Sequence, residues 1–242
     1  MTVLRAEEQR QTHRRPRPSS FVLKLAMAIT GVIFVAFVFV HMIGNLKVYQ
    51  GAEAFNSYAQ WLREVGYPLI PHTGVLWTLR VVLVTSLLVH LIAAVMLWLR
   101  GRAARGPHRR RRMMTGLTAF GARTMLLGGV IILVFVIIHL LDLTIGAALA
   151  PETYRHADAD GTMHAYQNLV ASFSRVPMAV FYALSMVVLA LHVFHGWRTV
   201  LQDVGATGRR LRLVWVTIGA VLAIAILIGN ALIPVLVLAG ML

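Results

Sequence analysis

Five long apolar segments, separated by polar connections, dominate the chain. Each is near or above the ~20 residues that a helix needs to cross the hydrocarbon core of a bilayer. They are rich in Val, Leu, Ile and Ala, and none alternates polar and apolar residues as the strand of a membrane barrel does. The pattern predicts an all-α membrane protein, a bundle of five transmembrane helices at about residues 21–46, 75–99, 124–148, 177–201 and 213–238.

The connections after the first and third apolar segments are long and contain aromatic residues. Phe55, Tyr58 and Trp61 lie in one of them, and Tyr166 and Phe173 lie in the other. Helices with aromatic and apolar residues on one side and polar residues on the other lie in the membrane–water interface. We therefore expect short surface helices in both connections.

Composition agrees with a protein that lies mostly in lipid. Of 242 residues, 58% are hydrophobic and only 13% are charged, and the mean hydropathy is +0.74. The net charge of +14 comes from basic residues confined to the stretches between apolar segments. That placement is typical of topology signals and lipid contacts and does not indicate nucleic acid. Because there are no cysteines, the chain's own thiolates build no disulfide, iron–sulfur cluster or zinc site.

The distribution of Lys and Arg predicts the orientation in the membrane. The N-terminal region and the second and fourth connections hold eighteen of these residues, whereas the opposite side holds five: Lys47, Arg63, Arg80, Arg155 and Arg175. The basic side faces the cytoplasm, so the N-terminus is expected inside and the C-terminus outside, in the cell (inner) membrane. Residues 1–18 lack the apolar core of a signal peptide and are expected to form a mobile basic cytoplasmic tail before a domain of residues 19–242. The basic run at residues 108–112 would face anionic lipid or dock a soluble partner.

Four histidines, one in each of the first four apolar segments, are the main chemical signal. His41, His90 and His139 follow one another at intervals of 49 residues, and His192 lies in the fourth segment. Counting from the segment midpoints at ~1.5 Å per residue puts His41 and His139 at one level in the outer half of the bilayer. His90 and His192 fall at a second level, in the inner half. Each level lies on the order of 5–8 Å from the midplane.

Two histidines at equal depth on different helices are the arrangement that a haem with two axial imidazoles needs. His195, one turn from His192, is an alternative ligand. A single histidine within a membrane is often no more than a hydrogen-bonded packing residue, and a cofactor-free structural anchor is therefore a second hypothesis. His13, His72, His108, His156 and His164 lie outside the apolar segments and are expected to be ordinary surface residues.

Transport coupled to ions is disfavoured by the near absence of acids from the apolar segments. Asp142, one turn after His139, is the only acid within them. Ion-coupled transporters and pumps keep chains of ionisable groups through the membrane. The fifth segment contains only Asn230 as a strongly polar residue and is expected to be a packing element.

Several stretches together resemble the cytochrome b membrane-anchor subunit of succinate dehydrogenase, of the single-subunit, five-helix type also found in fumarate reductases. The resemblance covers residues 19–242 and agrees in order and spacing. The stretches are HMIGNLKVYQGAEAFNSYAQWLR, RTMLLGGVIILVFVIIHLLDLT, NLVASFSRVPMAVFYALSM and ALHVFHGWRTVLQDVG.

The resemblance implies an anchor for a flavoprotein subunit and an iron–sulfur subunit on the cytoplasmic face, with electrons from succinate passing through the anchor to a quinone. It implies two haem b groups, the inner one on His90 and His192 and the outer one on His41 and His139. In some related fumarate reductases a glutamate for proton movement precedes the fourth-helix ligand by two residues, and here that position is Ala190.

The resemblance leaves the position of the quinone open. An acid of the outer quinone site in related enzymes falls near Glu64, whereas an inner pocket would use Ser20, Lys24, His195 and Trp197. A further redox alternative is a Rieske-type cluster on the inner histidines, with both cysteines supplied by the iron–sulfur subunit. The chain alone has no nucleotide-binding motif, no nucleophile–base pair and no cytoplasmic domain large enough for a dicarboxylate. Succinate chemistry is therefore expected on the partner subunits.

Overall fold

Five long helices form most of the protein. The structure is a computed structural model, and it describes residues 18–107, 117–203, 205 and 208–242. All five helices are long and apolar enough to cross a membrane, and the described residues contain no strand. The predicted all-α membrane bundle is confirmed. The helices are α2 (Ser20–Asn45), α4 (Gly74–Arg105), α5 (Leu117–His139) with its π-helical continuation η2 (Leu140–Ile145), α7 (Val176–Asp203) and α8 (Arg209–Leu238).

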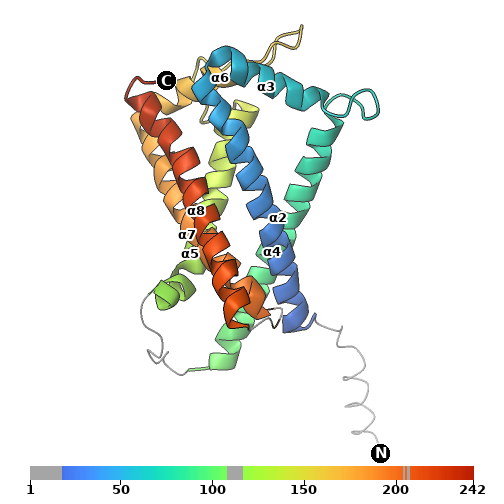
Figure 1. The fold of residues 1–242 in the computed structure, drawn as a ribbon, viewed down its shortest axis with the longest axis vertical. Coiled ribbons are helices and arrows are strands. Elements are labelled where there is room, and N and C mark those ends of the chain that lie inside the picture. The colour runs from blue at the N-terminus through green and yellow to red at the C-terminus, as the bar shows by residue number, and fades with distance from the viewer. Residues whose placement is uncertain (1–17, 108–116, 204, 206–207) are drawn as a thin grey trace, which may run out of the picture.

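The short helices all lie at one end of the bundle, which we call the upper end after Figure 1. They are the 3-10 turn η1 (Leu46–Gln50), α3 (Ala52–Glu64) and α6 (Ala165–Phe173). The expected surface helices are thus present in both long connections. Gly51, with φ of 92°, makes the turn from η1 into α3, a backbone conformation that favours glycine. The lower end holds the start of α2 and the ends of α4 and α7, with the larger share of the described Lys and Arg residues (Figure 1).

Several helix bounds differ from the predicted ones. Helix α4 continues to Arg105 instead of ending at 99, and α8 begins at Arg209 instead of 213. Basic residues end an apolar segment, but they are good helix formers and do not end the helix itself. The third span ends earlier than expected, because Gly146 adopts a left-handed conformation directly after η2. The tail at residues 1–17 and the basic run at 108–112 lie outside the described residues.

The helices pack as two unequal groups. Helix α8 packs along α7, α5 packs against the other side of α7, and α2 contacts both α7 and α8. Among the described residues, the substantial contacts of α4 are with α2 and α3 (Figure 1). The larger buried apolar cluster lies at the upper end. It joins η1 and α3 to the helices α5, α6, α7 and α8. It consists of Val48, Phe55, Phe135, Leu169, Phe173, Ala179, Tyr182, Met186, Ile233 and Val237.

Two tryptophans join α7 to α8 near the lower end. The rings of Trp197 and Trp215 stack with centroids 4.3 Å apart, and each indole N–H donates to the backbone carbonyl of the other residue, at 3.0 and 2.7 Å. Apolar burial drives helix association weakly in lipid, so packing and hydrogen bonds of this kind carry much of the helix–helix stability. Gly219 of α8 lies against the Trp197 ring and leaves no room for a Cβ atom.

A methyl group at Gly219 tests this tryptophan pair. We expect Gly219→Ala to destabilise the protein by about 1–3 kcal/mol, the usual cost of overpacking a well-filled contact. Thermal unfolding of the purified protein in detergent measures the effect. Gly101→Ala is the matched control, because a Cβ there meets no atom within 4 Å, and helical Gly→Ala changes stabilise by roughly 0.5–1 kcal/mol. Equal unfolding temperatures for the two variants would contradict the prediction.

Candidate functional site

The upper histidine pair comes together between α2 and α5. The ring centroids of His41 and His139 lie 6.0 Å apart, with the ring planes at 76° to each other. Phe37 stacks on His41 at 5.4 Å, and Phe135 stacks on His139 at 5.7 Å. Each phenylalanine precedes its histidine by four residues, so helix geometry places the two rings on one face and holds the imidazole.

His90 of the lower pair has a hydrogen-bond partner on α2. Its Nδ1 lies 2.9 Å from the Thr30 hydroxyl. That hydroxyl donates to the carbonyl of Ala26 at 2.7 Å, so its oxygen can accept from Nδ1 of His90. In the tautomer that carries its proton on Nδ1, the lone pair on Nε2 is available to a ligand. A hydrogen bond that orients the ring from its other nitrogen is the usual support of a metal-ligating histidine.

His192 of the lower pair lies against two glycines of α5. Cβ atoms placed on Gly128 and Gly129 would come within 3.9 and 3.7 Å of its ring. His192 and His195 both line a cavity of about 180 Å³ between α5 and α7. His195 is buried and packs directly on Gly121. Both histidines therefore remain candidate ligands at this level.

Within the part of the chain that the structure describes, three buried imidazole nitrogens have no hydrogen-bond partner: Nδ1 of His139, Nδ1 of His192 and Nε2 of His195. Buried polar atoms without a partner are rare in native proteins, because each loses its hydrogen bonds to water and forms no other hydrogen bond in their place. These rings therefore have capacity for a partner that the described chain does not supply.

The number of protein ligands limits the kind of group that fits. The described residues contain no cluster of three or more His, Cys, Asp or Glu side chains arranged to hold a metal ion. A bare metal ion in a closed site takes four or more protein ligands, whereas a porphyrin brings four nitrogens and needs only two axial ones. Two imidazoles on one metal, at about 2 Å each, place their centroids about 6 Å apart, which agrees with the 6.0 Å between His41 and His139.

Most of the residues expected at an inner quinone pocket are engaged with other groups. Ser20 accepts a hydrogen bond from Arg100 at 3.0 Å, and Lys24 forms an ion pair with Asp203 at 3.0 Å. Trp197 donates its N–H to α8, as described above. These contacts tie the lower ends of α2, α4, α7 and α8 together. At the other end, Glu64 is exposed, and its carboxylate accepts a long hydrogen bond of 3.4 Å from Gln60.

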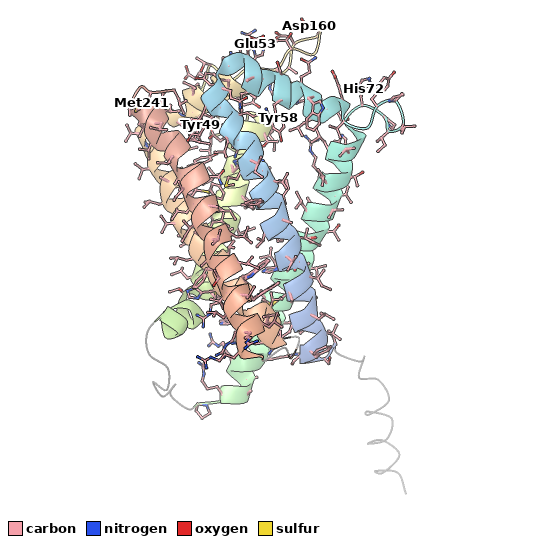
Figure 2. The ribbon with its side chains drawn as sticks, in the orientation of Figure 1. Tyr49, Glu53, Tyr58, His72, Asp160 and Met241 are labelled. Atoms are coloured by element: carbon pink, nitrogen blue, oxygen red, sulfur yellow. The ribbon has the colours of Figure 1, made fainter. Side chains whose placement is uncertain are left out.

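A pocket at the upper end includes residues that sequence reasoning did not assign to a site. It has a volume of about 530 Å³ and is lined by Lys47, Ala54, Ser57, Tyr58 and Trp61. Tyr58 stacks on Trp61 at 5.8 Å and packs on Gly44, one turn after His41. Figure 2 labels Tyr58 beneath α3, among the upper ends of the helices. In the sequence, the aromatic residues predict only a surface helix, because nothing in the pattern shows that α3 folds over α2.

A second group missed from the sequence surrounds Asp142 in η2. Asp142 and Ser172 are fully buried, and the Asp142 carboxylate accepts hydrogen bonds from Ser172, Tyr182 and Arg175. In the sequence, Asp142 stands out only as the single acid within the apolar segments. Arg175 counts only as one of the basic residues used to predict orientation in the membrane. Their partners are 30 to 40 residues away in the sequence, and only the three-dimensional fold brings them together.

The prediction for His164 was wrong. Its side chain is buried, and its Nε2 lies 2.9 Å from the Asp158 carboxylate. The short α6 and its preceding loop fold back over the bundle, which encloses a residue that lies outside the apolar segments. His72 and His156 are exposed as expected, whereas His13 and His108 lie outside the described residues.

Comparison with protein families decides the class of the protein. The model of the succinate dehydrogenase/fumarate reductase transmembrane subunit matches residues 100–231, more than half of the chain. The chain belongs to this family. Its members are membrane subunits, and the five apolar helices agree with a multi-pass membrane anchor that works with catalytic subunits. No curated protein and no solved structure matches the chain.

The family match confirms the resemblance seen in the sequence motifs. It spans α5, η2, α6 and α7 and most of α8, and so includes His139, Asp142 and His192. His41 and His90, on α2 and α4, precede the matched residues.

Proposed function

We propose that this membrane anchor passes electrons from an iron–sulfur partner subunit to a quinone through two haem b groups. His41 and His139 hold the upper, outer haem, and His90 with His192 holds the lower, inner one. The observation that carries the proposal is the 6.0 Å approach of His41 and His139 from two different membrane helices. Bound haem supplies one-electron transfer within the apolar bundle.

The residues around the histidines favour the ligand role. Thr30 favours the tautomer of His90 that leaves Nε2 free. Phe37 and Phe135 hold the upper rings by stacking. Gly128 and Gly129 leave His192 space on the α5 side. Apolar surroundings favour the neutral imidazole, which is the form that binds iron.

The flavoprotein and iron–sulfur subunits are proposed to dock at the lower end. Support comes from its basic side chains and from the contacts of Arg100 with Ser20 and of Lys24 with Asp203, which tie the helix ends into one surface. Succinate is oxidised on these partners, and the anchor contributes no group to that step.

The upper pocket is the stronger candidate for the quinone head group. Lys47, Ser57 and Tyr58 offer hydrogen-bond donors to a quinone carbonyl, and Tyr58 and Trp61 offer aromatic faces to its ring. Burial raises the pKa of the Tyr58 phenol above its ordinary value of 10.0, so the phenol remains a donor throughout the neutral pH range. Tyr58, which lines the pocket, packs on Gly44, one helical turn after His41.

Haem content tests the main proposal. We expect the purified complex to contain about two haems per anchor chain by the pyridine haemochrome assay, and His41→Ala or His139→Ala to lose about one of them. His72→Ala, which changes an exposed histidine at the upper end, should keep both. A wild-type complex without haem would favour the cofactor-free anchor. Electron paramagnetic resonance of that complex would reveal a Rieske-type cluster on the inner histidines, His90 and His192 or the alternative His195, instead.

Thr30→Val tests the orientation of His90. Loss of the hydrogen bond to Nδ1 is expected to weaken retention of the lower haem by about 10- to 100-fold, as for other groups that orient a metal ligand. Thr30→Ser keeps the hydroxyl and should behave as wild type. Haem loss during dilution, followed by absorbance, measures the effect. Identical retention in the Val and Ser variants would show that the bond has no part in haem binding.

Tyr58→Phe tests the quinone pocket. Removing one hydrogen bond of about 0.5–1.5 kcal/mol should raise the KM for quinone about two- to tenfold and leave haem content intact. Tyr49→Phe is the control, because Tyr49 is exposed at the same end and does not line the pocket (Figure 2). An unchanged KM in Tyr58→Phe, together with a raised KM in His195→Phe, would move the quinone site to the lower end.

A further inference from the structure

A buried ion pair lies beside the upper histidine pair. Arg175, which precedes α7, donates from Nη2 to Oδ1 of Asp142 at 2.7 Å, and Tyr182 donates its hydroxyl to Oδ2 at 3.0 Å. The Asp142 side chain has no exposed surface, whereas that of Arg175 is 35% exposed. The carboxylate is therefore held away from water, and its charge is balanced by a single guanidinium at the upper edge of the bundle.

This pair is connected to His139 in two ways. Asp142 follows His139 by three residues, within the π-helical segment η2 that continues α5. Tyr182, which donates to Asp142, places its ring edge-on to His139 with centroids 6.1 Å apart. Segments of π-helix occur frequently at functional sites. The ligand role proposed above makes no use of Asp142, Arg175 or Tyr182.

Charges buried in an apolar bundle can act on a nearby redox centre. In an apolar interior, two unit charges interact far more strongly than in water. A bis-imidazole haem gains one electron on reduction, so a nearby positive charge favours the reduced form and a nearby negative charge favours the oxidised form. With both partners present, the charges of Asp142 and Arg175 oppose each other.

We propose that the Asp142–Arg175 ion pair sets the reduction potential of the redox centre on His41 and His139. The inference rests on the proposed haem function. Asp142 and Arg175 act on the centre through space, and neither is a ligand. Their charges are balanced so that the centre can accept an electron from the lower centre and pass it to quinone.

Single neutralisations give opposite shifts under this proposal. Asp142→Asn leaves the guanidinium uncompensated and should raise the midpoint potential of the upper haem. Arg175→Gln leaves the carboxylate uncompensated and should lower it. The change in the reduction equilibrium is expected to be about tenfold or more in each direction, and tenfold corresponds to 59 mV for one electron. Spectroelectrochemical titration of the purified complex measures both haems, and the lower haem should not move.

Two further variants keep the test decisive. Glu53→Gln removes an exposed acid at the same end (Figure 2) and should shift neither haem. The double variant Asp142→Asn with Arg175→Gln should return to the wild-type potential, because no net charge is left. If only one single variant assembles, the direction of its shift decides: upward for Asp142→Asn or downward for Arg175→Gln supports the proposal. Failure of both single variants to assemble overturns it. Failure of the double variant to assemble, or shifts of the same sign in both single variants, overturns it in favour of a purely structural ion pair.

The ion-pair inference and the proposed haem function can fail separately. A wild-type complex that contains no haem contradicts the proposed function itself. Two haems whose potentials are the same in wild type, Asp142→Asn and Arg175→Gln would contradict only the inference about the ion pair.

Discussion

The need to give each polar group within an apolar bundle a partner governs this structure. Water is absent from the hydrocarbon core, so a buried donor or acceptor without a partner costs free energy that burial of apolar surface does not return. Asn45 meets this need by donating to Asn230 across α2 and α8 at 3.0 Å. Asp142 gathers three donors, and each indole of the tryptophan pair finds a carbonyl on the neighbouring helix. Against this background, the three buried imidazole nitrogens of His139, His192 and His195 are exceptional, because they have no partner among the described residues.

The overall fold follows closely from the sequence because the membrane simplifies the problem. An apolar stretch of about 20 residues has essentially one way to satisfy its backbone, so five stretches give five helices. Helix ends are less predictable. The charge of Arg100 ends the apolar segment, yet α4 continues to Arg105 because the helix extends past the hydrophobic stretch. Gly146 stops the third span through its left-handed conformation, and that conformation is not visible in a hydropathy profile.

The site is predictable only in part, for a related reason. His41 and His139 stand out in the sequence because imidazoles are rare within membrane helices, and helix rise alone places them at one depth. Depth says nothing about rotation around the helix axis, which decides whether two rings face each other. Contacts such as Tyr182 with Asp142, or Tyr58 with Gly44, depend on how connections fold back over the bundle. His164 shows the limit most clearly, since it lies outside every apolar segment and is buried all the same.

The packing of α4 mainly against α2 has a consequence for assembly. This helix carries His90, but its substantial contacts among the described residues are with α2 and α3 and not with α7, which carries His192. A group bound by both histidines would be the main physical link between the two helices. A ligand that binds only the folded form stabilises that form by mass action. Occupancy of the lower site and closure of the bundle around it would therefore be one coupled equilibrium. A chain that reached the membrane before its cofactor would then have a second span attached to the bundle mainly through α2.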